Sequence, residues 1–183
     1  MTNLLPNRTV FSPNLVYPRM TYYTRVVDNQ TGEQVFPWLS TSRNKNIFYG
    51  CVDAINGGES DFIVEYDIYN NEPYGWDGQG PTITAMDAVE CNLYIDFSSE
   101  CRNIGNFFYC RCVTYDPHAE WEAITPAHPQ YTKIQGAASP DFGTILGVGD
   151  HAVIQTKLML KKNTTICKEM YNFQLRFSYK YRR

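Results

Sequence analysis

The residue types best suited to metal or acid–base chemistry gather between positions 116 and 128. Acidic and imidazole side chains crowd this stretch: Asp116, His118, Glu120, Glu122 and His128. On a strand His118 and Glu120 would share one face, and both are zinc ligands, so a metalloenzyme using His118, Glu120 and His128 is the third interpretation. The spacing matches no zinc pattern, and mixed polar loops produce such clusters by chance. We therefore expect no metal site, no acid–base pair and no catalytic residue.

A glycine-rich loop carries the aromatic residues that could bind a ligand. Residues 70–81 read NNEPYGWDGQGP and include Tyr74 and Trp76. Aromatic side chains on such loops are frequent in recognition sites, so Tyr74 and Trp76, with Trp121 as a further candidate, could hold a sugar ring. The alternative, a tryptophan that folds back over the open end of the domain, is favoured. A carbohydrate- or ligand-binding module is thus the second interpretation of the chain.

The end of the chain predicts a strand with one basic face. From Tyr171 to Tyr181 every odd position is aromatic or apolar, and from 172 to 182 every even position is polar, which is the period of a strand. Four cations gather at this end: Arg176, Lys180, Arg182 and Arg183. Two interpretations of this basic cluster stay open. It either consists of solvated edge charges that discourage aggregation or docks an acidic neighbour in an assembly.

Charge is unevenly distributed along the sequence. The net charge is −3, but residues 53–122 carry fourteen acids and two bases, whereas residues 151–183 carry eight bases and one acid. Such asymmetry steers association, so the basic end of one subunit could meet an acidic surface of the next. Charges collected on one solvated side of a sheet are the alternative. Since phosphate binding requires a dominant basic field, we expect no direct contact with nucleic acid.

The six cysteines are expected to be reduced and mostly buried. Their even number permits disulfides, but the N-terminus does not resemble a secretory signal, and 183 residues can build a core without cross-links. Cys110 and Cys112 lie two apart on a predicted strand and share a face, which is not the spacing of a zinc knuckle or redox pair. Cys101 and Cys167, in predicted loops, are the expected exceptions.

Alternating segments predict a single all-β domain. They are Thr21–Val27 and Glu33–Trp38, joined by a turn, then Ile47–Val52, Phe62–Tyr69, Val89–Phe97, Asn106–Tyr115, Tyr131–Gln135, His151–Leu160 and 170–182. Within Phe62–Tyr69 the even positions are expected to face the core, and Glu65 and Asp67 to face outward. Many short strands with turn residues between them indicate an antiparallel β-sandwich of jelly-roll or immunoglobulin-like type over residues 21–183. The final strand is expected to be central or to pair with His151–Leu160.

Residues 1–20 predict an extended N-terminal arm. Pro6, Pro13 and Pro18 exclude a helix and disfavour a central strand, yet the segment is apolar enough to lie on a surface, its own or that of a neighbour. An ordinary first edge strand is the alternative. No stretch approaches the roughly 20 apolar residues of a membrane span, so we expect no membrane partner.

In the general pattern of its sequence the chain resembles small all-β virion proteins, such as capsid, capsid-auxiliary or tail components of bacteriophages or other viruses. The arm 1–20 and the pair 151–160 and 170–182 carry this resemblance, which is not a motif match. It implies a structural subunit in a virion assembled in the host cytoplasm, with copies of itself or other virion proteins as partners and without a cofactor. The acidic pI of about 5.6 favours an auxiliary, decoration or tail role over genome packaging.

Overall fold

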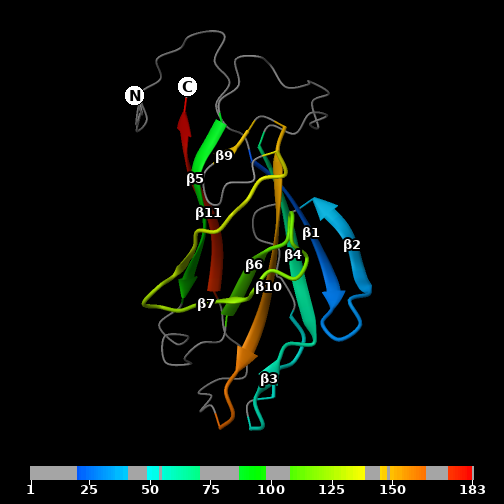
Figure 1. Cartoon of the computed structure of the whole chain (residues 1–183). Coiled ribbons are helices and arrows are strands. Elements are labelled where there is room, and N and C mark those ends of the chain that lie inside the picture. The colour runs from blue at the N-terminus through cyan, green and yellow to red at the C-terminus, as the bar shows by residue number, and fades with distance from the viewer. Residues whose placement is uncertain are drawn as a thin grey trace.

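The computed structural model describes residues 20–40, 49–53, 55–70, 87–97, 108–138, 145–147, 149–163 and 173–182. These residues form an all-β structure without a helix (Figure 1). Eleven strands follow one another: β1 Met20–Asp28, β2 Gln34–Ser40, β3 Gly58–Glu59, β4 Phe62–Asn70, β5 Asp87–Phe97, β6 Phe108–Cys112, β7 Glu122–Ile124, β8 Gln130–Tyr131, β9 Ile145–Leu146, β10 His151–Leu160 and β11 Phe173–Arg182. A search of this described part for a helix long and apolar enough to cross a bilayer found none.

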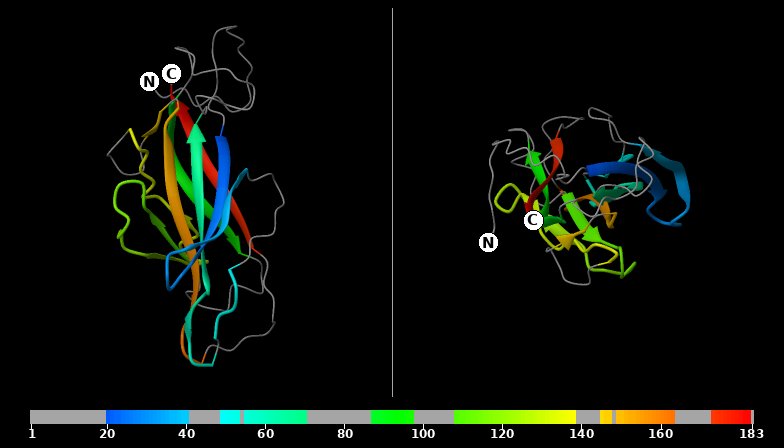
Figure 2. Two further views of the ribbon diagram at one scale, coloured as in Figure 1. Left: turned by 90° about the vertical axis from the view of Figure 1, so that its right-hand side faces the viewer. Right: turned by 90° about the horizontal axis from the view of Figure 1, so that it is seen from above.

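The strands form two antiparallel sheets. The larger sheet has the order β2-β1-β4-β10-β6-β7, with β3 paired to β10, and the smaller one has the order β11-β5-β8, with β9 paired to β5. Figure 2 shows β5 and β11 lying against the layer that contains β1, β4 and β10. The predicted β-sandwich architecture is therefore present in the described residues.

The buried side chains of the two sheets meet in one core. The large sheet contributes alternate residues of β4, β6 and β10, and the small sheet contributes alternate residues of β5: Val64, Tyr66, Ile68, Phe108, Cys110, Cys112, Ala152, Ile154, Cys91, Leu93 and Ile95. From β11, Leu175, Phe177 and Tyr179 pack against this core. The rings of Tyr22 and Phe177 meet edge to face with centroids 6.4 Å apart and join β1 to β11 across the two layers. Period-two alternation correctly identified the inward residues Val64, Tyr66 and Ile68 of β4, Ala152 and Ile154 of β10, and Cys91, Leu93 and Ile95 of β5.

Three of the cysteines are buried, as predicted from their position on strands. Cys91, Cys110 and Cys112 are buried free thiols, and Cys51 is an exposed free thiol. Cys110 and Cys112 lie on the inward face of β6. Cys101 and Cys167 lie outside the described residues.

The predicted hairpin is confirmed as β1 and β2. Its turn is held by Asp28, whose carboxylate oxygen Oδ1 accepts hydrogen bonds from the backbone N–H groups of Gln30 and Thr31, each at 2.8 Å. These bonds lower the pKa of the Asp28 carboxyl. Gly32 follows with a φ of 72°, a conformation that glycine adopts without a steric penalty. The turn thus fixes how β2 returns along β1.

The position predicted for the final strand is wrong. Strand β11 pairs with β5 along its length and has no other neighbour among the described strands. Strand β10 is the central one, between β4 and β6 of the larger sheet. Alternation specifies which face of a strand is buried, but it carries no information on which strand lies beside it.

Several predicted boundaries also change. Strand β1 begins at Met20, a residue packed against the core, so the predicted arm boundary at residue 20 falls inside a strand. Tyr49–Val52, the described part of the strand predicted at 47–52, is not in a strand. Strand β6 ends at Cys112 and not at Tyr115, and in the stretch predicted at 131–135 only Tyr131 belongs to a strand. Residues 1–19 and the loop 71–86 lie outside the described residues.

Candidate functional site

A row of polar side chains crosses the outer face of the larger sheet. Its four members come from β1, β4, β10 and β6 and stand in register: Arg25 opposite Glu65, Gln155 opposite Glu65, and Gln155 opposite Arg111. Residues directly opposite on neighbouring strands point to the same face and lie close enough to bond. Four strands far apart in the sequence therefore place these groups side by side. We call Arg25, Glu65, Gln155 and Arg111 the polar row.

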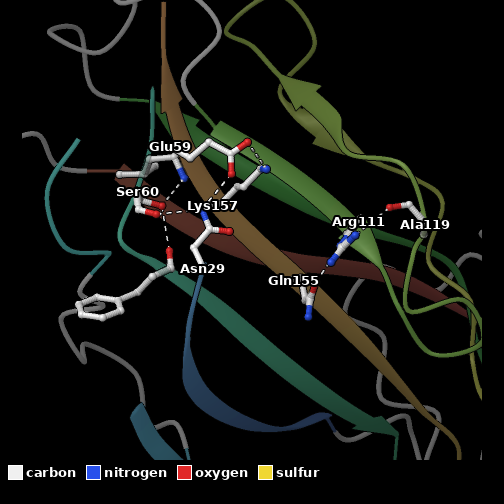
Figure 3. A network of polar contacts seen from close by, with 9 residues as sticks. Asn29, Glu59, Ser60, Arg111, Ala119, Gln155 and Lys157 are labelled. Atoms are coloured by element: carbon white, nitrogen blue, oxygen red, sulfur yellow. Dashed lines mark hydrogen bonds and ion pairs between the residues drawn. The ribbon is translucent and has the colours of Figure 1, made fainter. Parts of the chain in front are cut away.

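Each member of the polar row is bonded to the next. The Glu65 carboxylate forms an ion pair with the Arg25 guanidinium, and its Oε1 accepts a hydrogen bond from Gln155 Nε2 at 2.5 Å. Arg111 Nε donates to Gln155 Oε1 at 2.7 Å (Figure 3). The amide of Gln155 thus presents its donor to the anion and its acceptor to the cation. Glu65 lies on the outward face of β4, as predicted, but its neighbours in the polar row leave it only 4% exposed.

A second cluster lies farther along β10, around Lys157. Its Nζ donates to Glu59 Oε1 at 2.6 Å, and Asn29 Nδ2 donates to Glu59 Oε2 at 2.9 Å and to the Ser60 carbonyl oxygen at 3.0 Å. Figure 3 shows these four side chains gathered at one end of the strand. Burial alone would raise the pKa of Glu59, but the hydrogen bonds from Lys157 and Asn29 outweigh it, and the net pKa is lowered. The buried Lys157 ammonium is therefore paired with a carboxylate that is itself partly exposed.

Trp121 joins the Lys157 cluster to the polar row. The Arg111 guanidinium carbon lies 4.4 Å and the Lys157 nitrogen 4.3 Å from the centroid of its ring. Cations over an indole face are attracted by its quadrupole. Desolvation lowers the pKa of Arg111, while the negative charges of Glu65, Asp116 and Glu59 oppose that shift. The ring surface that a sugar would need is thus partly occupied by the protein's own cations.

The polar groups of the row and the Lys157 cluster have a structural role. Every cation of the row and cluster is paired with a carboxylate, an amide, a carbonyl or an aromatic ring, and the bonds tie β1, β4, β6 and β10 together. A satisfied polar network of this kind rigidifies the surface on which it lies. We therefore interpret the row and cluster as the support that positions the hairpin β1–β2.

Strand β2, at the edge of the large sheet, is the largest run of exposed apolar side chains in the described residues. It pairs with β1 and with no other described strand, and Figure 1 shows it on the side of the molecule away from β5 and β11. Four of its side chains are exposed: Val35 by 41%, Phe36 by 52%, Trp38 by 36% and Leu39 by 54%. The Arg25 guanidinium lies over Trp38, 4.8 Å from the ring centroid. The polar row thus ends at this apolar edge.

Two members of the predicted basic cluster stand on the outer face of β11. Arg176 and Lys180 are exposed, and each has a partner on β5. Lys180 Nζ lies 2.6 Å from Glu90 Oε2, and the Arg176 guanidinium lies 4.8 Å from the centroid of the Tyr94 ring. The backbone of Arg182 pairs with Asp87. The side chain of Arg182, and Arg183 as a whole, lie outside the described residues.

The remaining predicted sites are dispersed or not described. Tyr74 and Trp76 lie outside the described residues. His118, Glu120 and His128 are exposed. Within the described ranges no three histidine, cysteine or acidic side chains come together in a group that could hold a metal ion.

Sequence reasoning missed the polar row and the importance of β2. The row depends on strand register, which no local pattern reports. The signal at β2 was present: five apolar residues in succession, with a proline at their centre, lie between Gln34 and Ser40. Proline is confined to edge strands and bulges of a sheet, so this composition could have indicated an exposed edge.

Comparisons with protein-family models, curated proteins and solved structures found no match to this chain. The function proposed below therefore derives from the chain's own residues.

Proposed function

We propose that this chain is a structural, non-enzymatic subunit of a viral particle that acts through protein–protein assembly. The observation that carries the proposal is strand β2, an edge strand with four exposed apolar side chains. Apolar patches of this kind on a folded domain mark contacts with other proteins. The network of charged and polar groups behind β2 supports the proposal, because it holds the contact surface rigid before a partner arrives.

Within the particle, an auxiliary, decoration or tail role fits better than genome packaging. The chain is acidic, with a pI of about 5.6, and a protein that wraps nucleic acid needs a dominant basic field. Its partners would be further copies of itself or neighbouring virion proteins, met in the host cytoplasm during assembly. The exposed cations Arg176 and Lys180 provide a further surface for an acidic neighbour.

The finer fold type belongs to the same proposal. The chain passes from the large sheet to the small one between β4 and β5, between β7 and β8 and between β10 and β11, and it returns between β5 and β6 and between β9 and β10. Repeated crossing between two antiparallel sheets is a feature of jelly-roll and immunoglobulin-like sandwiches. We propose one of these types, with residues 1–19 as an extended arm that contacts a neighbour.

The size of the purified protein over a range of concentrations tests the assembly function. Sedimentation velocity should show species larger than the monomer as concentration rises, for the protein alone or mixed with its neighbouring gene products. Removal of residues 1–19 should leave the unfolding temperature nearly unchanged and reduce assembly. A protein that stays monomeric at high concentration, alone and with those neighbours, at low and high salt, would contradict the proposal.

The ligand-binding alternative receives no support from the described residues. Trp121, one of its three aromatic candidates, is packed by Arg111 and Lys157. For Tyr74 and Trp76 it stays a prediction, which a glycan-binding measurement on Trp76→Ala would test.

A further inference from the structure

We propose that the Lys157 amine and the Asn29 side-chain amide condense to an intramolecular isopeptide bond, with the Glu59 carboxylate carrying protons between them. Lys157 lies on β10, and Asn29 follows β1 directly. Because β4 lies between β1 and β10 in the larger sheet, the bond would join two strands that do not pair with each other. The inference concerns a reaction within one chain and does not depend on the proposed assembly function.

One carboxylate contacts both reacting groups. Lys157 Nζ donates to Glu59 Oε1 at 2.6 Å, and Asn29 Nδ2 donates to Glu59 Oε2 at 2.9 Å. Figure 3 shows the amine and the amide directed at this one side chain. The nitrogen that would attack and the nitrogen that would leave are therefore each one hydrogen bond from the same proton carrier, which is the position that a general acid–base group needs.

The backbone holds all three side chains in place. Strand β3 pairs with β10 so that Glu59 and Lys157 stand on the same face. Asn29 is anchored twice: its backbone N–H donates to the Asp61 carbonyl oxygen at 2.9 Å, and its Nδ2 donates to the Ser60 carbonyl oxygen at 3.0 Å. Groups held side by side in this way react much faster than the same groups meeting from solution.

The surroundings of Lys157 suit a nucleophile. Its side chain is only 8% exposed, and its Nζ lies 4.3 Å from the centroid of the Trp121 ring. Removal of water activates a lysine amine for attack. Lys133 makes a comparable ion pair with Glu122, at 2.7 Å, but its side chain is 61% exposed. Lys133 is therefore the matched control.

The reaction balances without an oxidant or a co-reactant. Glu59 Oε1 takes a proton from the Lys157 ammonium, and the freed lone pair on Nζ forms a bond to Asn29 Cγ. Glu59 passes the proton to Nδ2, the Cγ–Nδ2 bond breaks, and its electron pair leaves with the ammonia. A second proton from Nζ, again carried by Glu59, converts the ammonia to ammonium. A primary amide and an alkylammonium thus give a secondary amide and an ammonium ion, and Glu59 ends as a carboxylate.

The properties of Glu59 predict that the reaction is slow. Its side chain is 41% exposed. Burial alone would raise its pKa, but the hydrogen bonds from Lys157 and Asn29 outweigh burial and lower it, which makes the carboxylate a weak base. We therefore expect the bond to accumulate after folding has finished. Freshly purified protein should still contain the ion pair.

Mass spectrometry of aged protein tests the bond. During several days at physiological temperature the intact mass should fall by one ammonia per chain. Trypsin does not cleave after a lysine whose amine is acylated, so digestion should release a branched peptide that joins residues 26–43 to residues 134–161. On a denaturing gel under reducing conditions the linked chain should migrate faster, because the bond closes a loop.

Variants assign the roles. Glu59→Gln keeps the size of the side chain but cannot accept the proton, and Lys157→Arg keeps the positive charge but removes the amine. Neither should give the branched peptide under conditions where the wild type does. Lys133→Met, which removes the exposed lysine, should give as much of it as the wild type. Circular dichroism checks that each variant is folded.

Each contrary outcome identifies what is wrong. A wild-type chain that yields no branched peptide after ageing overturns the inference. Ammonia loss confined to one unbranched peptide, such as the one containing Asn56 and Gly57, overturns it as well. A branched peptide formed by Glu59→Gln at the wild-type rate would show that Glu59 is not the proton carrier. The proposed assembly function is decided separately, by sedimentation of fresh protein.

Discussion

At the scale of single residues, Glu65 is the buried carboxylate of the polar row. It is buried at the centre of the larger sheet, with Arg25 on one side and Gln155 on the other. A buried carboxylate with two donors stabilises a fold only as long as both donors remain, since removal of one partner leaves the other unsatisfied.

We expect Glu65→Gln to lower the free energy of unfolding by about 1–3 kcal/mol. The amide keeps the shape of the side chain, but it loses the charge that pairs with Arg25 and replaces one acceptor oxygen with a donor. Urea denaturation followed by tryptophan fluorescence measures the change. Glu33→Gln, at an exposed position of the hairpin, is the control and should stay within about 0.5 kcal/mol of the wild type. Equal effects at both positions would show that Glu65 is not held as described.

The thiols differ in reactivity because their surroundings differ. Burial raises the pKa of the Cys91 thiol to about 12 and the pKa of the Cys110 thiol well above its usual value. Since the thiolate is the nucleophile, an alkylating reagent at pH 8 should label exposed Cys51 in the folded protein and leave Cys91 and Cys110 unmodified. Peptide mapping by mass spectrometry reads each site, and labelling in denaturant controls for intrinsic reactivity. Rapid labelling of Cys91 in the native state would contradict its burial.

At the scale of elements, the alternation of apolar residues predicted most long strands and their buried faces. For β5 the pattern identified Cys91, Leu93 and Ile95, all of which are buried. It failed at Glu90, where a φ of 51° and a register shift against β11 interrupt the strand, so that neighbouring Ala88 and Val89 are both buried. A local bulge of this kind depends on tertiary packing and not on residue period.

Pairing between elements was the part that the sequence could not supply. Strands β10 and β11 show equally clear alternation, yet they belong to different sheets. For the same reason the polar row could not be assembled in advance: Arg25, Glu65, Gln155 and Arg111 lie on four strands, and only their register makes them neighbours. Strand β2 was predictable as a strand, and its central proline could have indicated an edge position, but only the pairing shows that β1 is its one described neighbour.

The turn before β3 yields a sharp test of close packing between elements. Gly57 has a φ of 77°, and a Cβ at this position would lie 2.6 Å from the backbone nitrogen of Lys162, just after β10. A backbone atom cannot rotate away as a side chain can, so the turn would have to open. We expect Gly57→Ala to lower the free energy of unfolding by about 2 kcal/mol or more, since strain and steric conflict add.

Gly32 provides the matched control for this change. Its φ of 72° is similar, but nothing lies within 4 Å of an added Cβ. Gly32→Ala should therefore show the conformational cost alone, about 1 kcal/mol. Thermal or urea unfolding of the two variants separates strain from collision. A Gly57→Ala variant no less stable than Gly32→Ala would show that the Gly57 turn does not pack against the end of β10.

At the scale of the whole molecule, folding brings together the charges that the sequence keeps apart. Strand β10, from the basic end of the chain, lies between β4 and β6 of the acidic region, and β11 lies on β5. Among the described residues, three ion pairs or charge-assisted contacts connect the two regions: Lys157 with Glu59, Lys180 with Glu90, and His151 with Asp67. Much of the predicted attraction between a basic end and an acidic surface is thus satisfied within one chain.

This internal pairing predicts how stability responds to acid, with Glu59 as the reporter. The folded-state pKa of Glu59 is lowered from 4.5, so its contribution is complete above about pH 4.5 and is lost as the pH falls through the folded-state pKa. The difference in free energy of unfolding between the wild type and Glu59→Gln should therefore be largest near neutral pH and vanish in strong acid. Because Glu59 is 41% exposed, solvent screening should keep it below about 1 kcal/mol. Urea unfolding at pH 3, 4, 5 and 7, with Glu33→Gln measured in parallel to account for the loss of one surface charge, gives the comparison. A difference that stays constant from pH 7 to pH 3 would mean that the Glu59 carboxylate does not hold Lys157. The link between the basic and acidic regions at this end of β10 would then have another origin.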